Sequence, residues 1–202
     1  MRSNIFVILM IVLSACNTAS ITNPAYVTEM DEYRQAEELK LVSAGGPLTE
    51  ESVEGISYFT ADEKYKVIAN FQKIKADSVT VIPTYSGKKK DYIEFANLSF
   101  NIDGRQQYLK AFKGLQAMRI PQYKNKLFIM FKDLTNGETT YGGGRYIYID
   151  ESNIEGDALE IDFNKSFNPF CAYSDGFSCP IPPPENHLSI AINAGERAFK
   201  GH

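Results

Sequence analysis

The chain has 202 residues, of which 44% are hydrophobic and 23% charged, and its formal net charge is −4 at pH 7. This composition is sufficient for one well-packed core and requires no second domain. Nucleic-acid binding calls for clustered positive charge, which the sequence lacks. The run Lys88–Lys90 is followed directly by Asp91, and we interpret it as a solvated hairpin turn. With 12 Tyr, 13 Phe and no Trp, the core is expected to be aromatic and β-rich.

The first fifteen residues have the pattern of an export signal. Arg2 supplies positive charge, and residues 5–13 form an apolar run shorter than the roughly 20 residues of a membrane-spanning helix. The run ends in Leu-Ser-Ala-Cys16, which resembles a bacterial lipobox, a motif whose cysteine receives a diacylglycerol and becomes the acylated amino terminus. We therefore expect a lipoprotein signal peptide over residues 1–15 and a membrane anchor on Cys16. An ordinary secretory signal or a short membrane anchor is the alternative.

The residues after the cysteine indicate a location. Asn17 stands where an Asp would indicate inner-membrane retention in some Gram-negative bacteria, and no acidic run resembling a surface-export signal follows. The expected location is the cell envelope, at the outer membrane facing the periplasm. Residues 16–25 are small and polar and predict a tether. Residues 26–202 are predicted to form a single domain, helical over 26–55 and β-rich over 56–202; without residues 1–15 the chain has 20 basic and 25 acidic residues.

Two helices are predicted at the start of the domain. Residues 26–42 carry apolar side chains mostly three or four positions apart, which is typical of an amphipathic helix packed across a sheet. Thr28 or Asp31 would cap its start, and the Gly-Gly-Pro sequence after residue 44 would end it. A second, short helix is expected to begin after Thr49 and to end near Gly55.

From residue 56 onward, short segments alternate or run apolar between turn residues. The predicted strands cover residues 65–71, 79–82, 93–102, 107–112, 127–131, 146–149, 159–163 and 188–192. Asp103-Gly104 is a strong hairpin signal. The pattern predicts an α+β, mainly β fold: an antiparallel barrel or strongly curved sheet with one or two N-terminal helices.

The segment Asp133–Tyr146 contains three consecutive glycines. It lacks GxGxxG and GxxxxGK[ST] and no helical pattern follows it, so a flexible hairpin is favoured over a phosphate-binding loop. Arg145 has a planar guanidinium that suits a carboxylate or a phosphate. It is a candidate ligand contact, and a structural ion pair with Asp150 or Asp162 is equally compatible with the sequence.

Cys171 and Cys179 are eight residues apart. An oxidising periplasm favours a disulfide between them, and closing this nine-residue ring would stabilise the fold by about 2.5 kcal/mol. A metal site formed by both cysteines and His187, with Glu185 nearby, is the alternative, although the CxxC spacing typical of such sites is missing. We expect no cofactor.

The prolines between Pro180 and Pro184 fix the backbone after the second cysteine. We interpret them as a brace that holds Glu185 and Asn186 in a fixed direction. A polyproline segment that docks into an aromatic groove of a partner is the other interpretation.

Five segments together resemble the signature of an uncharacterised bacterial and archaeal family, domain of unknown function 1684. They are GGGRY (142–146), DFN (162–164), NPFCAYS (168–174), CPIPPPEN (179–186) and AGER (194–197). The resemblance covers most of the mature chain and implies no established activity. Family members that look cytoplasmic also carry both cysteines, which keeps the metal alternative open.

The resemblance places a polar site at the matching positions. The candidate ligand-binding residues are Arg145, Asp162, Asn164, Asn168, Glu185, Asn186 and Glu196. We expect a lipid-anchored protein that binds a small polar or anionic ligand through its C-terminal loop. The alternatives are a hydrolase or metal-dependent enzyme using Glu185, His187 and the cysteines, with acid–base chemistry by Asp162, Glu185 or Glu196, and a structural envelope protein that docks a partner.

Overall fold

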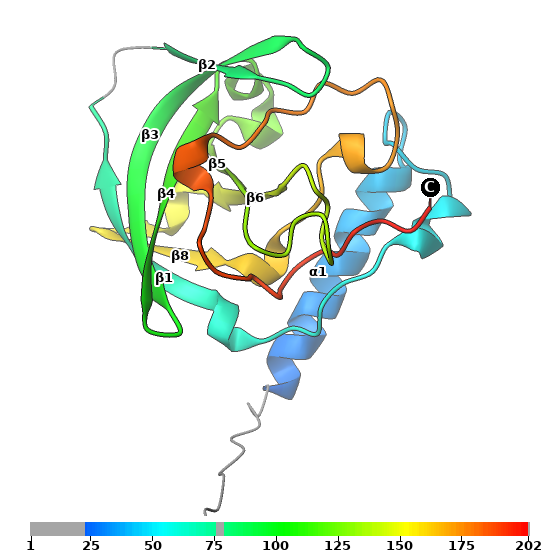
Figure 1. The fold of residues 1–202 in the computed structure, drawn as a ribbon, viewed down its shortest axis with the longest axis horizontal. Helices are drawn as coiled ribbons and strands as arrows, with labels where there is room; N and C mark the ends of the chain where they lie inside the picture. Colours follow the sequence, from blue (N-terminus) through cyan, green and yellow to red (C-terminus); the bar gives the residue numbers. More distant parts are fainter. Residues whose placement is uncertain (1–22, 76–78, 202) are drawn as a thin grey trace, which may run out of the picture.

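The computed structural model describes residues 23–75 and 79–201. The predicted signal peptide, Cys16 and most of the predicted tether therefore lie outside the described residues. Within this part of the chain, one long helix precedes a mainly antiparallel sheet of eight strands, and the C-terminal segment crosses the open side of the sheet (Figure 1). Nowhere in residues 23–75 and 79–201 is a helix long and apolar enough to cross a membrane.

The helix α1 spans Pro24–Val42 and begins two residues before the predicted start. Asn23, and neither Thr28 nor Asp31, is its N-cap: the Asn23 side chain accepts a hydrogen bond from the backbone N–H of Ala25 at 3.1 Å. The proline at the first helical position has no N–H that would need a partner. The last residues of the predicted tether are therefore part of the helix.

The second predicted helix is a single 3-10 turn, η1 (Ser52–Gly55), and the Thr49 hydroxyl accepts a hydrogen bond from the backbone N–H of Ser52. Seven further one-turn 3-10 segments occur among the described residues. They are η2 (Glu63–Tyr65), η3 (Ala117–Arg119), η4 (Pro121–Tyr123), η5 (Glu151–Asn153), η6 (Phe163–Lys165), η7 (Phe170–Ala172) and η8 (Pro184–Asn186).

The strands follow the predicted series closely. They are β1 (Lys66–Lys73), β2 (Val79–Pro83), β3 (Lys89–Ile102), β4 (Arg105–Gly114), β5 (Lys126–Phe131), β6 (Arg145–Asp150), β7 (Ile154–Glu155) and β8 (Ala158–Asp162). Their order in the sheet is β6-β5-β4-β3-β1-β8-β7, with β2 beside β3. The sheet is curved (Figure 1). Among the described strands no pairing joins β6 to β7, so the sheet is also open. The predicted barrel is wrong, and the predicted curved sheet is confirmed.

The long strand β3 bends the sheet. Its first part pairs with β2 and its last part pairs with β1, and the register to β4 shifts between Glu94 and Ala96. Such a bulge increases the local twist and lets a long strand turn a corner. The β3–β4 hairpin closes on Asp103 and Gly104, which both have positive φ, as the Asp-Gly signal predicted.

The predicted last strand, residues 188–192, is not a strand of the sheet, and its backbone bends at Ser189 and Ile190. The Leu188 N–H donates to the Lys132 carbonyl, while the Ile192 N–H donates to the side chain of Asp133. Because side chains meet part of its hydrogen-bonding need, no regular pairing forms. Its alternating buried residues belong to the larger core instead, and its backbone crosses the open side of the sheet (Figure 1).

Apolar side chains are buried on both faces of the sheet. The larger core combines one face of nearly every strand with residues 188–194 of the C-terminal segment. A smaller cluster covers the opposite face of β2 to β6. Its members are Ile82, Tyr92, Phe112, Phe128, Met130 and Tyr146, with Phe167 packed against them.

Candidate functional site

A cleft of about 860 Å³ lies over the smaller cluster. Its floor comes from β5 and β6, and its walls include the C-terminal half of α1 and the segment around the two cysteines. Aromatic rings dominate the lining, including Tyr92, Phe128, Tyr146, Tyr148 and Phe167. The volume lies within the range of roughly 300–1,000 Å³ that is usual for small-molecule sites.

Four of these rings form a continuous stack, which we call the aromatic row. Tyr92 and Phe128 stack at 6.0 Å, Phe128 and Tyr148 at 4.9 Å, and Tyr148 and Phe167 at 5.7 Å, measured between ring centroids. The interplanar angles are 19°, 28° and 24°. Tyr146 packs edge-on against Phe128 and Phe167 and so fixes the row from one side.

The local sequence explains why the row is continuous. Phe128 and Tyr148 are register partners in β5 and β6, so their rings meet on one face of the sheet. Tyr92 in β3 lies opposite Gly114 in β4. A Cβ at position 114 would lie only 3.3 Å from the Tyr92 ring, so the glycine leaves room for the ring to reach across β4. The row therefore follows from cross-strand register together with a glycine beneath the first ring.

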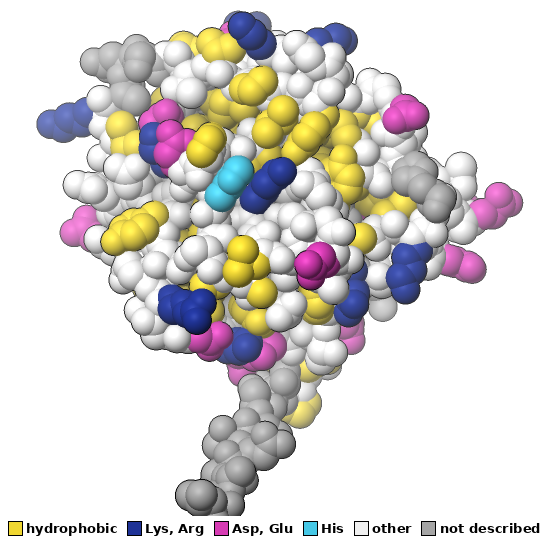
Figure 2. All heavy atoms as spheres, viewed as in Figure 1, with side chains coloured by type: hydrophobic (Ala, Val, Ile, Leu, Met, Phe, Trp, Pro, Cys, Tyr) yellow, Lys and Arg dark blue, Asp and Glu magenta, His cyan; other side chains and the backbone are white. Residues whose placement is uncertain are grey.

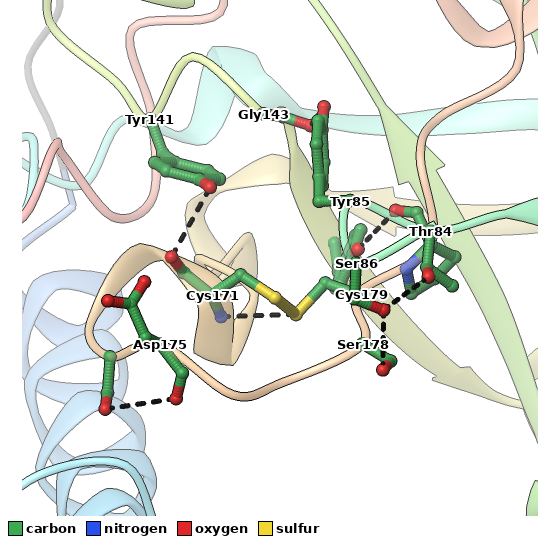
Figure 3. The surroundings of a disulfide bond; sticks show 12 residues. Thr84, Tyr85, Ser86, Tyr141, Gly143, Cys171, Asp175, Ser178 and Cys179 are labelled. Atoms are coloured by element: carbon green, nitrogen blue, oxygen red, sulfur yellow. Dashed lines mark hydrogen bonds between the residues drawn. A yellow bond between two sulfur atoms is a disulfide. The ribbon is translucent and has the colours of Figure 1, made fainter. Parts of the chain in front are cut away.

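The segment with the two cysteines forms one wall of the cleft. Cys171 and Cys179 form a disulfide, which confirms the predicted pairing (Figure 3). Phe170 and Phe177 line the cleft and pack edge to face, with 5.2 Å between their ring centroids. Phe170 directly precedes the disulfide-closed loop, and Phe177 lies within it. The Tyr146 hydroxyl donates to the carbonyl of Pro180 and ties this wall to the cleft floor.

Hydrogen bonds join the disulfide segment to two other loops (Figure 3). The Tyr141 hydroxyl donates to the Cys171 carbonyl at 3.4 Å, and the Ser86 hydroxyl donates to Ser178 at 2.8 Å. Tyr85 donates to the carbonyl of Gly143. The cross-linked wall is thus held by both the glycine loop and the turn after β2, and the glycine loop has a structural role here.

Lys90 is the cleft residue that departs most from the prediction. Lys88 and Lys89 are exposed, as expected for a solvated turn, but Lys90 is half-buried and lines the cleft. That part of the interpretation is wrong because Lys90 lies in β3, two residues before Tyr92 and therefore on the same face. Burial lowers the pKa of the Lys90 ammonium.

Arg145 is fully buried, so it does not line the cleft surface. Its guanidinium pairs with Asp133 at 2.9 Å, whereas the sequence suggested Asp150 or Asp162. It also donates to the backbone carbonyls of Ile192, Ala194 and Glu196. The arginine thus fastens the C-terminal segment to β6, and the paired carboxylate is supplied by the loop after β5.

Glu196 lies at the edge of the cleft, with 1% of its surface exposed. Its carboxylate accepts hydrogen bonds from the Tyr173 hydroxyl and from the backbone and side chain of Asn168. Burial outweighs these donors and raises the pKa of Glu196 to about 7. Of the predicted site residues, the structure brings Arg145, Asn168 and Glu196 into one buried network.

The remaining buried candidates lie at two other places. Asp162 accepts hydrogen bonds from the Tyr26 hydroxyl and from Asn164, and so fastens α1 to the end of β8. Asn164, which also lines the cleft, exchanges two hydrogen bonds with the backbone of Asp62. Asn186 lies between strands: its side chain bonds the N–H and carbonyl of Lys110 and the carbonyl of Met130.

Glu185 and His187 are exposed and do not line the cleft, and the face that Figure 2 shows has a histidine (cyan) at its surface. The ring Nε2 of His187 lies 3.2 Å from the carbonyl oxygen of Pro182. The alternative metal site requires both cysteines as thiolates, and the structure joins their sulfur atoms in the disulfide. Within residues 23–75 and 79–201, no three His, Cys, Asp or Glu side chains form a group that could hold a metal ion.

The prediction missed the aromatic row and Lys90, although the sequence contains a signal for the row. Phe128, Met130, Tyr146 and Tyr148 make β5 and β6 apolar on both faces, whereas a strand with one face in water alternates with polar residues. That pattern indicates that something covers the second face. It does not indicate that the cover leaves a cleft.

The open, curved antiparallel sheet with one N-terminal helix defines a mainly β protein with a small second cluster on its outer face. A family model described as protein of unknown function (DUF1684) matches residues 51–197. The chain therefore belongs to this family, as its C-terminal motifs predicted.

The fold and part of the sequence are similar to those of a solved structure. It is the solution NMR structure of the uncharacterized protein from gene locus rrnAC0354 of Haloarcula marismortui. The two chains are 31% identical with a TM-score of 0.63, and the match covers 87% of this chain and 97% of that one. No curated protein gives a significant match.

Proposed function

We propose that this protein is a lipid-anchored envelope protein whose aromatic cleft binds a small molecule with a flat or apolar body. The observation that supports this proposal is the aromatic row, which offers a run of stacked rings at the floor of a cleft of about 860 Å³. Tyr148 is 39% exposed although its neighbours in the row pack against it. An exposed ring within such a cluster leaves apolar surface for a ligand to cover.

The proposed binding surface is the aromatic row, whereas the sequence predicted the polar side chains of the C-terminal loop. The C-terminal loop contributes a wall of the cleft through Phe170, Phe177 and Pro180, while most of its polar side chains hold the backbone. Nothing in the contacts of Glu185 or His187 favours the enzyme alternative. Pro182 is buried so close to Gly144 that a Cβ added to this glycine would lie 2.8 Å from the Pro182 Cγ, which favours the bracing interpretation of the prolines over partner docking.

The proposal is tested by titrating the soluble protein from residue 17 with N-phenyl-1-naphthylamine, a neutral probe that fluoresces in apolar sites. We expect saturable binding, and Tyr148→Ala should weaken it about tenfold because one aromatic contact is lost. Tyr108→Ala is the matched control, since Tyr108 is exposed on β4 and does not line the cleft. Absence of saturable binding, or equal effects of both variants, would contradict the proposal.

A further inference from the structure

Lys90 differs from the other cations of the cleft in its pairing. The others are Arg34, Lys40, Lys126 and Lys165, and each has a carboxylate within 4.0 Å. In the described part of the chain, no carboxylate pairs with the ammonium of Lys90, and this ammonium makes no hydrogen bond. Its neighbour Asp91 is exposed and forms no ion pair with it.

The position of Lys90 relates it to the aromatic row. Tyr92 is the first ring of the row and lies two residues further along β3, so both side chains project from the same face. The row then continues through Phe128 and Tyr148 to Phe167. A ligand that lies along the row therefore has the Lys90 ammonium at its Tyr92 end.

The energetics favour an anion at that end. A half-buried ammonium has lost part of its hydration without gaining a partner, and this loss is what lowers its pKa. A negatively charged ligand group would restore a charge-assisted hydrogen bond in a site where the surroundings screen charge poorly. A neutral ligand would leave this cost uncompensated.

Building on the proposed function, we propose that the cleft takes an anionic amphiphile. Its apolar or aromatic body covers the aromatic row, and its single anionic group, a carboxylate, sulfonate or phosphate, pairs with the ammonium of Lys90. Lys90 then determines specificity for charge, and the row supplies most of the contact area.

A pair of probes with the same body separates the two parts of this proposal. 8-Anilinonaphthalene-1-sulfonate differs from N-phenyl-1-naphthylamine by its sulfonate group. Lys90→Gln should weaken binding of the sulfonate probe about tenfold, the equivalent of one charge-assisted hydrogen bond, and change binding of the neutral probe less than about twofold. Lys90→Arg, which keeps the charge, should restore most of the affinity. Lys89→Gln is the control, because it removes the same charge from an exposed neighbour on the same strand.

The outcomes distinguish this inference from the proposed function. If Tyr148→Ala weakens both probes but Lys90→Gln affects neither selectively, the cleft binds ligands and the charge assignment is wrong. The same holds if Lys89→Gln lowers affinity as much as Lys90→Gln, since the effect is then one of overall charge. If neither probe binds, or if Tyr148→Ala changes neither, the proposed function fails and the inference fails with it.

Discussion

Arg145 shows how a side chain that suits a ligand can instead serve the fold. Its charge is compensated inside the protein by Asp133, and three carbonyls of the C-terminal segment accept hydrogen bonds from its two terminal nitrogens. Its buried Nε–H has no partner among the described residues. The sequence identified this residue as special but could not identify the partner. The sequence suggested Asp150 or Asp162 and missed Asp133, because the pairing depends on the tertiary path of the chain.

We expect Arg145→Met to lower the free energy of unfolding by about 3–5 kcal/mol, because it leaves the Asp133 carboxylate buried without its partner. Urea denaturation measures this loss. Arg105→Met, at an exposed position at the start of β4, should change stability by less than about 0.5 kcal/mol. A stable Arg145→Met protein that has lost ligand binding would instead restore the ligand-contact role predicted from sequence.

Glu196 makes stability depend on pH. Its pKa is raised from 4.5 to about 7, so the folded protein holds this proton more tightly than the unfolded chain. The resulting stabilisation is complete below about pH 4.5 and is lost as pH rises through 7, amounting to about 3 kcal/mol. Urea denaturation at pH 5 and pH 8 should show that Glu196→Gln removes this component of the pH dependence. An unchanged difference between the two pH values would show that Glu196 titrates normally.

At the scale of the elements, the junction of β4 and β5 is held by a side chain. The two strands share one register pair, Phe112 with Phe128, and beyond it the amide of Asn186 bridges their backbones. No sequence pattern predicts such an insertion, because it depends on where residues 180–186 return to the sheet. The same return path explains why η8 is buried at its last residue and exposed at Glu185.

Asn186→Ala should therefore destabilise the protein by about 2–4 kcal/mol, since it leaves two backbone carbonyls and one N–H buried without partners. Asn193→Ala, at an exposed position of the same segment, is the matched control. Thermal or urea unfolding of both variants measures the difference. Equal stability of the two variants would mean that water or a shift of β4 and β5 replaces the amide.

The disulfide between Cys171 and Cys179 should affect both the stability of the protein and the shape of the cleft. The variant with Cys171→Ala and Cys179→Ala should lose about 2–3 kcal/mol of stability, by the loop-closure estimate for a ring of this length. Because Phe170 and Phe177 line the cleft beside the disulfide, the variant should also bind N-phenyl-1-naphthylamine more weakly. Reduced stability with unchanged probe binding would show that the wall keeps its position without the cross-link.

For the whole molecule, the sequence predicted which segments form strands and helices far better than it predicted how these elements pack together. The spacing of apolar residues located the main helix and seven of the eight described strands, because these residues alternate along most of the strands and run continuously in β5. It failed at residues 188–192, where alternation is also present but the segment fills the interior and donates hydrogen bonds to the Asp133 side chain and the Lys132 carbonyl. It failed likewise for the cleft, which depends on how α1 and the disulfide segment cover β5 and β6.

The proposed membrane anchor is a property of the whole protein. We expect metabolic labelling with palmitate to mark the wild-type protein when it is produced in a Gram-negative host, and Cys16→Ala to abolish the label. The variant should then leave the membrane fraction, because the acyl chains supply the membrane affinity. Labelled Cys16→Ala protein, or a variant that stays with membranes after a carbonate wash, would contradict lipidation at this cysteine.

The C-terminal segment also sets the order in which the chain can fold. Leu188, Ile190 and Ile192 fill the core between strands that begin with β1, which is synthesised more than a hundred positions earlier, and end with β8, which is synthesised about 30 positions earlier. Contacts of such long sequence separation form late and slowly, because the loop between them must close first. A nascent chain that has not yet released this segment therefore lacks a complete core, and we expect it to fold only after release. That delay suits a protein proposed to be threaded through an export channel, where premature folding would block passage.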